Sequence, residues 1–133
     1  MKFICFGYAD PARCQNLTEK EGAAGLEKCF AYDDQLRSGG HFIGGDALEM
    51  GKGVKLEFQN GAVQVTDLSM GSGQIVLGGI LYLEARDLKH AIELVSKHPG
   101  VQMGPWEIRP ADQKMNDLIE ARGKAHAKQA AGR

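Results

Sequence analysis

The order of the secondary-structure patterns along the chain predicts an α+β domain. Two segments with helical periodicity each lie between two strand-like segments, an Asn-Gly pair marks a hairpin between the two halves, and a polar helix follows. Two β-α-β halves can share one antiparallel sheet that carries both helices on one face, which is a ferredoxin-like plait. The sequence therefore predicts a ferredoxin-like plait with an inserted β-hairpin and an extra C-terminal helix.

Composition and charge limit the partners to be expected. The chain of 133 residues fits one domain, with 43% apolar and 25% charged residues. The net charge of −1 gives no positive excess for phosphate backbones, so no nucleic acid is expected as a partner. No apolar run approaches the roughly 20 residues of a membrane-spanning helix, so no membrane is expected either. Three cysteines without a C-x-x-C pair, and a strand pattern in place of a leader, predict a cytoplasmic protein.

The chain begins with a strand pattern and a capped helix. Residues 2–8 are apolar on both alternating faces, which favours a buried central strand. Thr18 and Glu21 fit a capping box, and the helix that follows is expected to run from residue 19 to about residue 38. Gly39-Gly40 supplies its left-handed C-terminal stop.

The first helix has an apolar stripe with one interruption. Apolar residues recur at the spacing of one helix face at four positions, which are Leu26, Cys29, Phe30 and Leu36. Asp33 lies on the same face and breaks the stripe. A short strand over residues 41–45 comes next.

The middle of the chain contains the clearest local pattern, a β-hairpin. Residues 54–58 and 62–66 flank Asn60-Gly61, a pair that favours the positive φ angles of a type I′ turn. A strand over residues 75–84 follows. Gly78-Gly79 inside that strand indicates a bulge or the close approach of another backbone.

Three further patterns complete the C-terminal part. Asp87 caps a second helix, whose end is marked by Pro99-Gly100. Residues 105–109 form a short last strand. Residues 112–129 form a polar helix with only a narrow apolar stripe, and such a stripe docks weakly.

Both helices of the predicted plait cover the same face of the sheet. The other face is apolar and must be covered, and a second copy of the chain is the usual cover. We therefore expect a homodimer of the dimeric α/β-barrel type. The plait itself is expected over residues 1–110, and residues 111–133 form the C-terminal helix and tail.

The second half of the chain contains an ordered series of short motifs. They are Val65–Met70, Gly78–Tyr82, Asp87-Leu88, His98–Gly100 and Glu107–Pro110. In this order and spacing they resemble the DGPF branch of the YCII-related family. The first motif occupies the D-G-P-F position and the second the G-G-F-Y position. The resemblance covers about residues 2–110 and leaves the C-terminal helix outside.

The resemblance implies a ferredoxin-like dimer with a cleft between the sheet and the helices. The family includes proteins similar to muconolactone-type isomerases or dehalogenases, and others associated with alternative sigma factors. The resemblance therefore implies no single reaction. The founding YCII branch uses a His-Asp pair at positions where this chain has Gly25 and Arg37, and that pair is therefore not expected. The D-G-P-F motif is degenerate because only Asp67 remains, and Gln74 replaces the loop lysine.

Two residues are the candidate catalytic groups. Asp67 ends a strand before a Gly/Ser-rich loop, where a carboxylate can remove a proton next to a carbonyl, or else fix the turn through loop amides. His41 lies close to Asp46 and is either a proton shuttle or a solvated strand-end histidine.

The remaining features favour ordinary structural roles. Three histidines are expected on or near helical surfaces and receive no role: His90, His98 and His126. No H-x-H, H-x-x-x-H or cysteine pair occurs, and the glycine-rich loops match no phosphate-binding pattern, so neither a metal nor a cofactor is expected. Three aromatic side chains either line an apolar pocket or pack in the core or a dimer interface: Tyr8, Tyr82 and Trp106.

Two classes of function fit these features. The first is a binding or regulatory module that holds a small metabolite bearing a carbonyl group. The second is a cofactor-independent isomerase or lyase, in which Asp67 is the base and His41 its partner. An enclosed pocket that faces a shielded carboxylate favours the enzyme, and an open or filled cleft favours the module.

Overall fold

The computed structural model describes residues 1–68 and 73–132. Within this part the helices and strands follow the order that the sequence predicts, with two short helical segments in addition. In chain order the elements are β1 (Lys2–Ala9), α1 (Pro11–Cys14), α2 (Glu19–Ser38), β2 (Phe42–Ala47), β3 (Val54–Gln59), β4 (Ala62–Asp67), β5 (Val76–Glu84), α3 (Leu88–Ser96), η2 (Pro99–Met103), β6 (Trp106–Pro110) and α4 (Gln113–Ala131).

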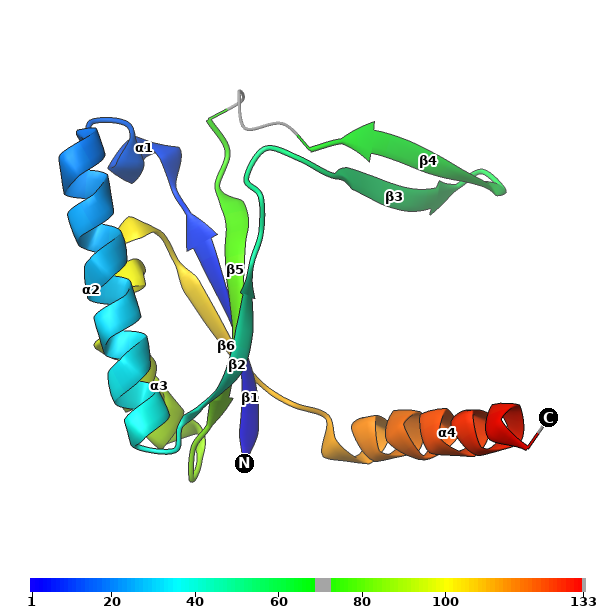
Figure 1. The fold of residues 1–133 in the computed structure, drawn as a ribbon. Coiled ribbons are helices and arrows are strands. Elements are labelled where there is room, and N and C mark those ends of the chain that lie inside the picture. Colours follow the sequence, from blue (N-terminus) through cyan, green and yellow to red (C-terminus); the bar gives the residue numbers. More distant parts are fainter. Residues whose placement is uncertain (69–72, 133) are drawn as a thin grey trace.

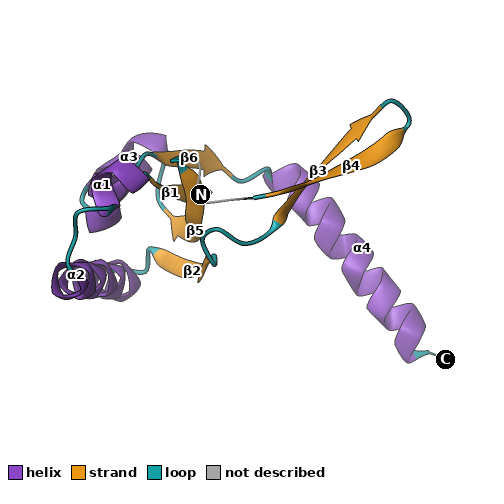
Figure 2. Cartoon of the chain, turned by 90° about the horizontal axis from the view of Figure 1, so that it is seen from above, coloured by secondary structure: helices purple, strands orange, loops and turns teal. Residues whose placement is uncertain are grey.

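Four strands form one antiparallel sheet in the order β2-β5-β1-β6. Helices α2 and α3 lie on the same side of this sheet (Figure 1). The hairpin β3-β4 and the helix α4 extend from its other side, and they diverge when seen from above (Figure 2). The chain is thus an α+β fold with one layer of helices on an antiparallel sheet.

The core lies between the sheet and the two helices. Because side chains alternate along a strand, Phe3 and Cys5 of β1 point toward the helices and are fully buried. Leu36, Leu81, Leu83, Ala85, Ala91 and Val95 complete this core. Ile4 and Phe6 point to the opposite face and stay half-exposed. The expectation of a strand buried on both faces is therefore wrong for the single chain: only one face of β1 is covered.

The boundaries of α2 are those the sequence predicts. Thr18 is the N-cap, and its Oγ1 accepts a hydrogen bond from the amide of Glu21 at 3.1 Å. Gly39 is the C-cap, and Gly40 takes the left-handed conformation with φ 78°. Two short helical segments, α1 and η2, lie where loops were expected, and in each a proline occupies the first turn.

The hairpin is confirmed, and it forms a sheet of its own. Asn60 (φ 54°) and Gly61 (φ 79°) both have the positive φ that a type I′ turn needs. All twelve positions of β3 and β4 are exposed. The predicted bulge in β5 is also confirmed, because Gly7 pairs with Gly79 and Tyr8 with Leu77, which leaves Gly78 without a partner on β1.

Helix α4 begins at an aspartate cap and stays exposed along its length. The carboxylate of Asp112 accepts from the amide of Met115 at 2.8 Å. Within the described ranges no helix is both long enough and apolar enough to cross a membrane.

Candidate functional site

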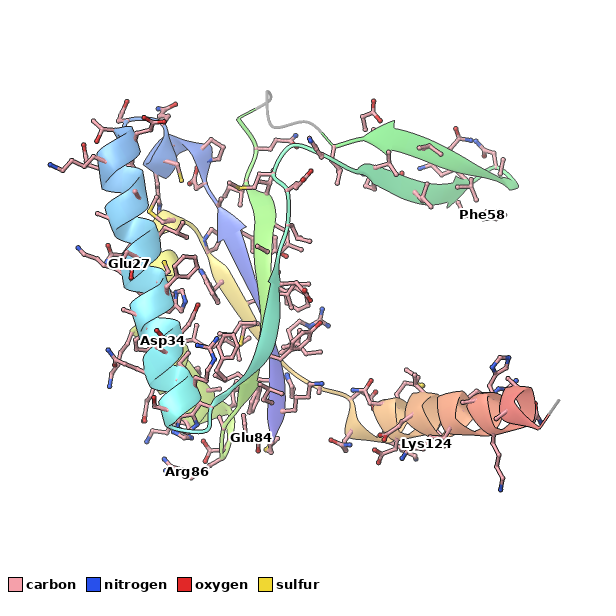
Figure 3. The ribbon with its side chains drawn as sticks, in the orientation of Figure 1. Glu27, Asp34, Phe58, Glu84, Arg86 and Lys124 are labelled. Carbon is pink, nitrogen blue, oxygen red and sulfur yellow. The ribbon has the colours of Figure 1, made fainter. Side chains whose placement is uncertain are left out.

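A cleft of about 620 Å³ lies between α2 and the sheet. We call it the α2 cleft. Its walls are mainly apolar, and side chains from α2 and from the sheet fill the layer between the two elements (Figure 3). Helix α2 contributes the thiol and the charged side chains of one wall: Cys29, Asp33, Asp34 and Arg37.

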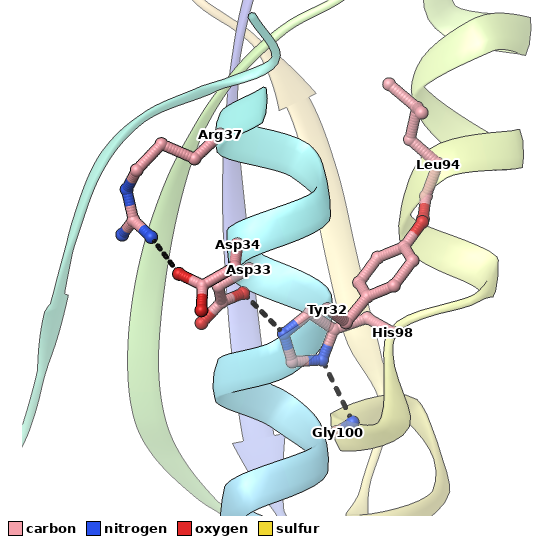
Figure 4. A network of polar contacts seen from close by, with 7 residues as sticks. All are labelled: Tyr32, Asp33, Asp34, Arg37, Leu94, His98 and Gly100. Carbon is pink, nitrogen blue, oxygen red and sulfur yellow. Dashed lines mark hydrogen bonds and ion pairs between the residues drawn. The ribbon is translucent and has the colours of Figure 1, made fainter. Parts of the chain in front are cut away.

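His98 lies at the inner end of this cleft and is 7% exposed. It is the N-cap of η2, so the turn that begins η2 positions its imidazole. Its Nδ1 accepts a hydrogen bond from the amide of Gly100 at 2.9 Å, and its Nε2 lies 3.0 Å from Oδ1 of Asp33 (Figure 4). A nitrogen that accepts from an amide carries no proton, so the neutral ring has its hydrogen on Nε2 and donates it to Asp33.

Two aromatic rings hold the imidazole of His98 in place. The ring of Tyr32 meets it edge-on at 5.6 Å between centroids, and the indole of Trp106 lies 4.9 Å away on a tilted plane. The hydroxyl of Tyr32 donates to the carbonyl of Leu94, and burial raises the pKa of this phenol. His98 is therefore fixed by two hydrogen bonds and by two ring contacts.

Asp33 is one of three aspartates that line the cleft, together with Asp34 and Asp46, and it is the one that contacts His98. Its side chain is 23% exposed and lines the cleft, and Oδ1 accepts the bond from His98. In the described part of the chain no hydrogen-bond donor reaches Oδ2. Asp33 thus has one oxygen held by a neutral histidine and one oxygen free for a molecule in the cleft.

Cys29 lies one helical turn before Asp33 and also lines the cleft. Burial raises the pKa of its thiol, the negative charge of Asp33 raises it further, and a hydrogen bond with the backbone of Gly100 lowers it. Burial, and after it the carboxylate that His98 orients, therefore both favour the neutral form of the thiol.

One charged pair borders the cleft. Arg37 reaches Asp34 at 2.5 Å, and its guanidinium lies over the ring of Phe42 at 4.2 Å from the centroid. Because the Asp34 side chain is 73% exposed, water screens this pair, and its contribution to stability is small.

Two glycines make room for the rings around His98. A Cβ on Gly7 would lie 2.8 Å from Cζ2 of Trp106. A Cβ on Gly100 would lie 3.0 Å both from Nδ1 of His98 and from Cζ2 of Trp106. The indole and the imidazole occupy the space that any side chain at these positions would need.

The two candidates from the sequence lie apart from the α2 cleft and from each other. Asp67 ends β4 in the exposed hairpin, pairs with Val54, and lines a second cavity of about 960 Å³ at the hairpin base. His41 lies just before β2, where its Nδ1 is 2.9 Å from the carbonyl of Glu84 and its ring meets that of His90 edge-on. The structure does not bring Asp67 and His41 together, and a catalytic role for either stays a prediction.

Several sequence features can now be placed. Of the three aromatic candidates, Tyr8 and Trp106 line the α2 cleft, whereas Tyr82 points to the opposite face of the sheet. Positions 69–72, which include part of the D-G-P-F segment and Gly71-Ser72, lie outside the described residues. Among residues 1–68 and 73–132, no group of three or more His, Cys, Asp or Glu side chains is arranged to hold a metal ion.

Neither member of the central pair was predicted from the sequence. His98 was expected on or near a helical surface and without a role, and the surface position is wrong: His98 is buried against Tyr32 and Trp106. A His-Asp pair was not expected because Gly25 and Arg37 occupy the positions that the family resemblance implies, yet Asp33 and His98 form such a pair from other positions. The available signal was Asp33 itself, a charged residue on an otherwise apolar helix face.

Comparisons with known proteins add the following. The YCII-related domain matches residues 1–112. A comparison with curated proteins gave no match. Among solved structures, the 5-chloro-2-hydroxyhydroquinone dehydrochlorinase (TftG) of Burkholderia phenoliruptrix AC1100, in complex with 2,5-dihydroxybenzoquinone, is similar at 18% identity with a TM-score of 0.42, over 84% of this chain and 94% of that chain. Because the matched domain spans most of the sequence, the chain belongs to the YCII-related domain family.

Proposed function

We propose that the α2 cleft binds a small, largely apolar molecule that carries a carbonyl group, and that Asp33 exchanges a proton with it. The hydrogen bond between His98 and Asp33 carries this proposal. The buried histidine holds Oδ1 of Asp33 and so fixes the orientation of the whole carboxylate, which is partly shielded from water. Oδ2 then has a defined position in the cleft, as a general base requires. The protein would then act as an isomerase or a lyase.

The proton transfer at Asp33 can be written as a balanced step. The free oxygen of Asp33 takes a proton from the carbon next to the carbonyl, and the C–H electron pair moves into the carbonyl to form an enolate. Asp33 is then a carboxylic acid, still bonded to His98 through its other oxygen. Return of the proton to a different carbon gives an isomerisation, and expulsion of a leaving group from the enolate gives an elimination.

A binding or regulatory module is the second candidate, and one observation favours it. Both ring nitrogens of His98 are engaged, one by Gly100 and one by Asp33, so the pair also serves to join η2 to α2. In that case the cleft holds its ligand without chemistry, and Asp33 only recognises a hydrogen-bond donor on it.

Three finer assignments complete the proposal. A ferredoxin-like plait is supported by the strand order β2-β5-β1-β6 with both longer helices on one face. Membership of the DGPF branch is supported by the order of the motifs along the sequence. A homodimer is supported by the face of the sheet opposite α2 and α3, where four half-exposed residues form an uncovered apolar surface: Ile4, Phe6, Ile80 and Tyr82. We call this surface the open face.

The test uses Trp106, the one tryptophan of the chain, which lines the cleft. A panel of cyclic ketones, enones and enol lactones is titrated against the protein while the fluorescence of Trp106 is followed. Compounds that bind are then incubated with the protein in D₂O, and proton NMR measures exchange at the carbon next to the carbonyl. We expect binding of at least one compound and exchange that the wild-type protein accelerates.

Three variants identify the base. Asp33→Asn is expected to bind the same compound and to lose about 100-fold or more of the exchange rate, because general base catalysis contributes at least this factor. Glu27→Gln, an exposed change on the same helix, leaves the rate unchanged. Loss of exchange in Asp67→Asn, with a normal rate in Asp33→Asn, would transfer the role to Asp67. Binding without any exchange in the wild-type protein would select the binding module.

A further inference from the structure

We propose that the hairpin β3-β4 and the helix α4 are two arms that close on a second copy of this chain. This inference rests on the homodimer proposed above and extends it, since it assigns the contact surfaces outside the sheet. Both arms extend from the side of the sheet that carries the open face (Figure 1). The helix α4 begins at Gln113 and lies beyond the matched domain.

One face of the hairpin is apolar except for Asp67 at the base, and it has no cover within the described part of the single chain. Cross-strand register places Leu56 opposite Val65 and Phe58 opposite Val63, and these side chains share one face because residues pair directly across an antiparallel ladder. Their exposed fractions are high, 62% for Leu56 and 75% for Phe58. Phe58 lies near the tip of the hairpin, far from the sheet (Figure 3). An isolated two-stranded hairpin is marginal in water, so this face needs a partner.

The helix α4 also has an apolar face that nothing in the described residues of the single chain covers. Met115, Leu118 and Ile119 fall on one face at helical spacing, and they are between 52% and 61% exposed. An isolated helix of 19 residues with few strong stabilising pairs is also marginal, and most helical stability in proteins comes from packing of the apolar face. The hairpin and α4 therefore extend from the same side of the sheet, and each has an apolar face without a packing partner among the described residues.

The chain exposes more surface than a compact protein of its mass, and the excess is large enough to form a dimer interface. A compact protein of 14.4 kDa exposes about 6,800 Å², whereas this chain exposes 9864 Å². The excess is roughly 3,000 Å² per chain. If each copy buries only half of it, the interface reaches roughly 3,000 Å² in total, which lies in the range of obligate dimers.

A second copy fits this surface better than a membrane or an unrelated protein. The polar face of the hairpin carries Lys55 and Glu57, which pair with each other at 2.8 Å, so it offers no positive surface to anionic lipids. A two-fold partner brings the same three apolar surfaces that are unpaired here: an open face, a hairpin face and an α4 stripe. In an isologous interface each of these finds its complement on the other copy.

The first measurement is the mass of the full chain by sedimentation velocity or light scattering. The expected mass is twice 14.4 kDa. A wild-type mass of 14.4 kDa at micromolar concentration would overturn both the homodimer and the arms.

Matched variants then test the arms separately from the dimer. Phe58→Glu and Leu118→Glu are expected to weaken the dimer at least tenfold. Gln59→Glu on the polar hairpin face and Ala131→Glu on the opposite side of α4 add the same charge and are expected to leave it intact. All four positions are exposed in the single chain, so folding of the monomer does not explain a difference. A wild-type dimer that both apolar variants leave unchanged would retain the homodimer and refute the arms.

A crosslink identifies the occupant directly. A photoreactive phenylalanine analogue replaces Phe58 in a mixture of ¹⁴N- and ¹⁵N-labelled chains. The expected product is a crosslinked peptide pair of mixed isotope composition at the mass of a dimer. Crosslinks confined to pairs of one isotope would show contact within a chain and would overturn the proposal.

Discussion

At the residue scale, the central feature is a histidine with no free nitrogen. Gly100 and Asp33 engage the two ring nitrogens of His98, and Tyr32 and Trp106 contact its ring. Because the amide of Gly100 requires an acceptor at Nδ1, it sets the tautomer and directs the remaining hydrogen to Asp33. The reactive atom of the pair is therefore the free oxygen of Asp33, and His98 is a positioning residue.

Truncation of His98 is expected to destabilise the protein. His98→Ala leaves a cavity between two rings and removes the partners of the Gly100 amide and of Asp33, so the free energy of unfolding should fall by about 2–4 kcal/mol. Urea denaturation followed by circular dichroism measures this change. His126→Ala, an exposed change on α4, should stay within about 0.5 kcal/mol. Equal effects of the two variants would contradict the central position of His98.

The thiol of Cys29 reports the charge of Asp33. The carboxylate raises the pKa of the thiol, so Asp33→Asn lowers that pKa toward its ordinary value. At a pH about one unit below 9.0 the variant then has more thiolate and is alkylated faster by iodoacetamide. Peptide mass spectrometry separates Cys29 from Cys5 and Cys14. A rate that stays equal or falls would show that Asp33 is not a negative charge beside Cys29.

At the scale of elements, the site depends on where α2, η2 and β6 meet. Helix α2 supplies Asp33, the turn at the start of η2 supplies His98, and β6 supplies Trp106. The β1–β6 pairing places Gly7 opposite Trp106, which leaves space for the indole. Three segments far apart in the sequence thus converge on one imidazole.

A methyl group on Gly7 should displace Trp106. In Gly7→Ala the new Cβ would lie within 3 Å of two indole carbons, so we expect a loss of about 1–3 kcal/mol and a changed emission spectrum of Trp106. Gly22→Ala is the matched control, because no atom lies within 4 Å of its Cβ and alanine favours a helix. The control should therefore stabilise by up to about 1 kcal/mol. Unchanged stability and emission in Gly7→Ala would contradict this packing.

Element boundaries could be predicted from the sequence because they depend on local chemistry. Thr18 before α2, Gly39-Gly40 after it, Asn60-Gly61 in the hairpin and Asp87 before α3 each act through their own backbone neighbourhood. The site could not be predicted in this way. Asp33 and His98 are 65 positions apart, and only the packing of α2 against η2 brings them together. The interruption of the α2 stripe by Asp33 was the one local signal.

At the scale of the whole molecule, the two arms contribute nothing to the core of the domain, so we expect them to stabilise the dimer and not the single chain. The core lies between the helices and the sheet. In β3, β4 and α4, by contrast, every apolar side chain is exposed. Which surface covers them is not encoded in local patterns, so the sequence predicted the need for a partner from the open face alone.

If the arms pack on a second copy, the melting temperature depends on protein concentration. A species that binds the folded state adds stability by mass action, so the wild-type melting temperature should rise by several degrees over a roughly hundredfold increase in concentration. Because its dimer is weaker, Phe58→Glu should melt at a lower temperature than the wild type at each concentration. Differential scanning calorimetry measures both. A wild-type melting temperature that is constant over this range would contradict a stabilising dimer.

The most direct test of the pair at the α2 cleft is the tautomer of His98, measured by long-range proton–nitrogen NMR correlation of the ¹⁵N-labelled protein. The account predicts an unprotonated Nδ1 and a protonated Nε2, and it predicts that Asp33→Asn shifts the Nε2 hydrogen while Nδ1 keeps its acceptor signature. A ring protonated on Nδ1, or an Nε2 resonance that Asp33→Asn leaves unchanged, would show that His98 does not hold the carboxylate and would remove the basis for Asp33 as the base.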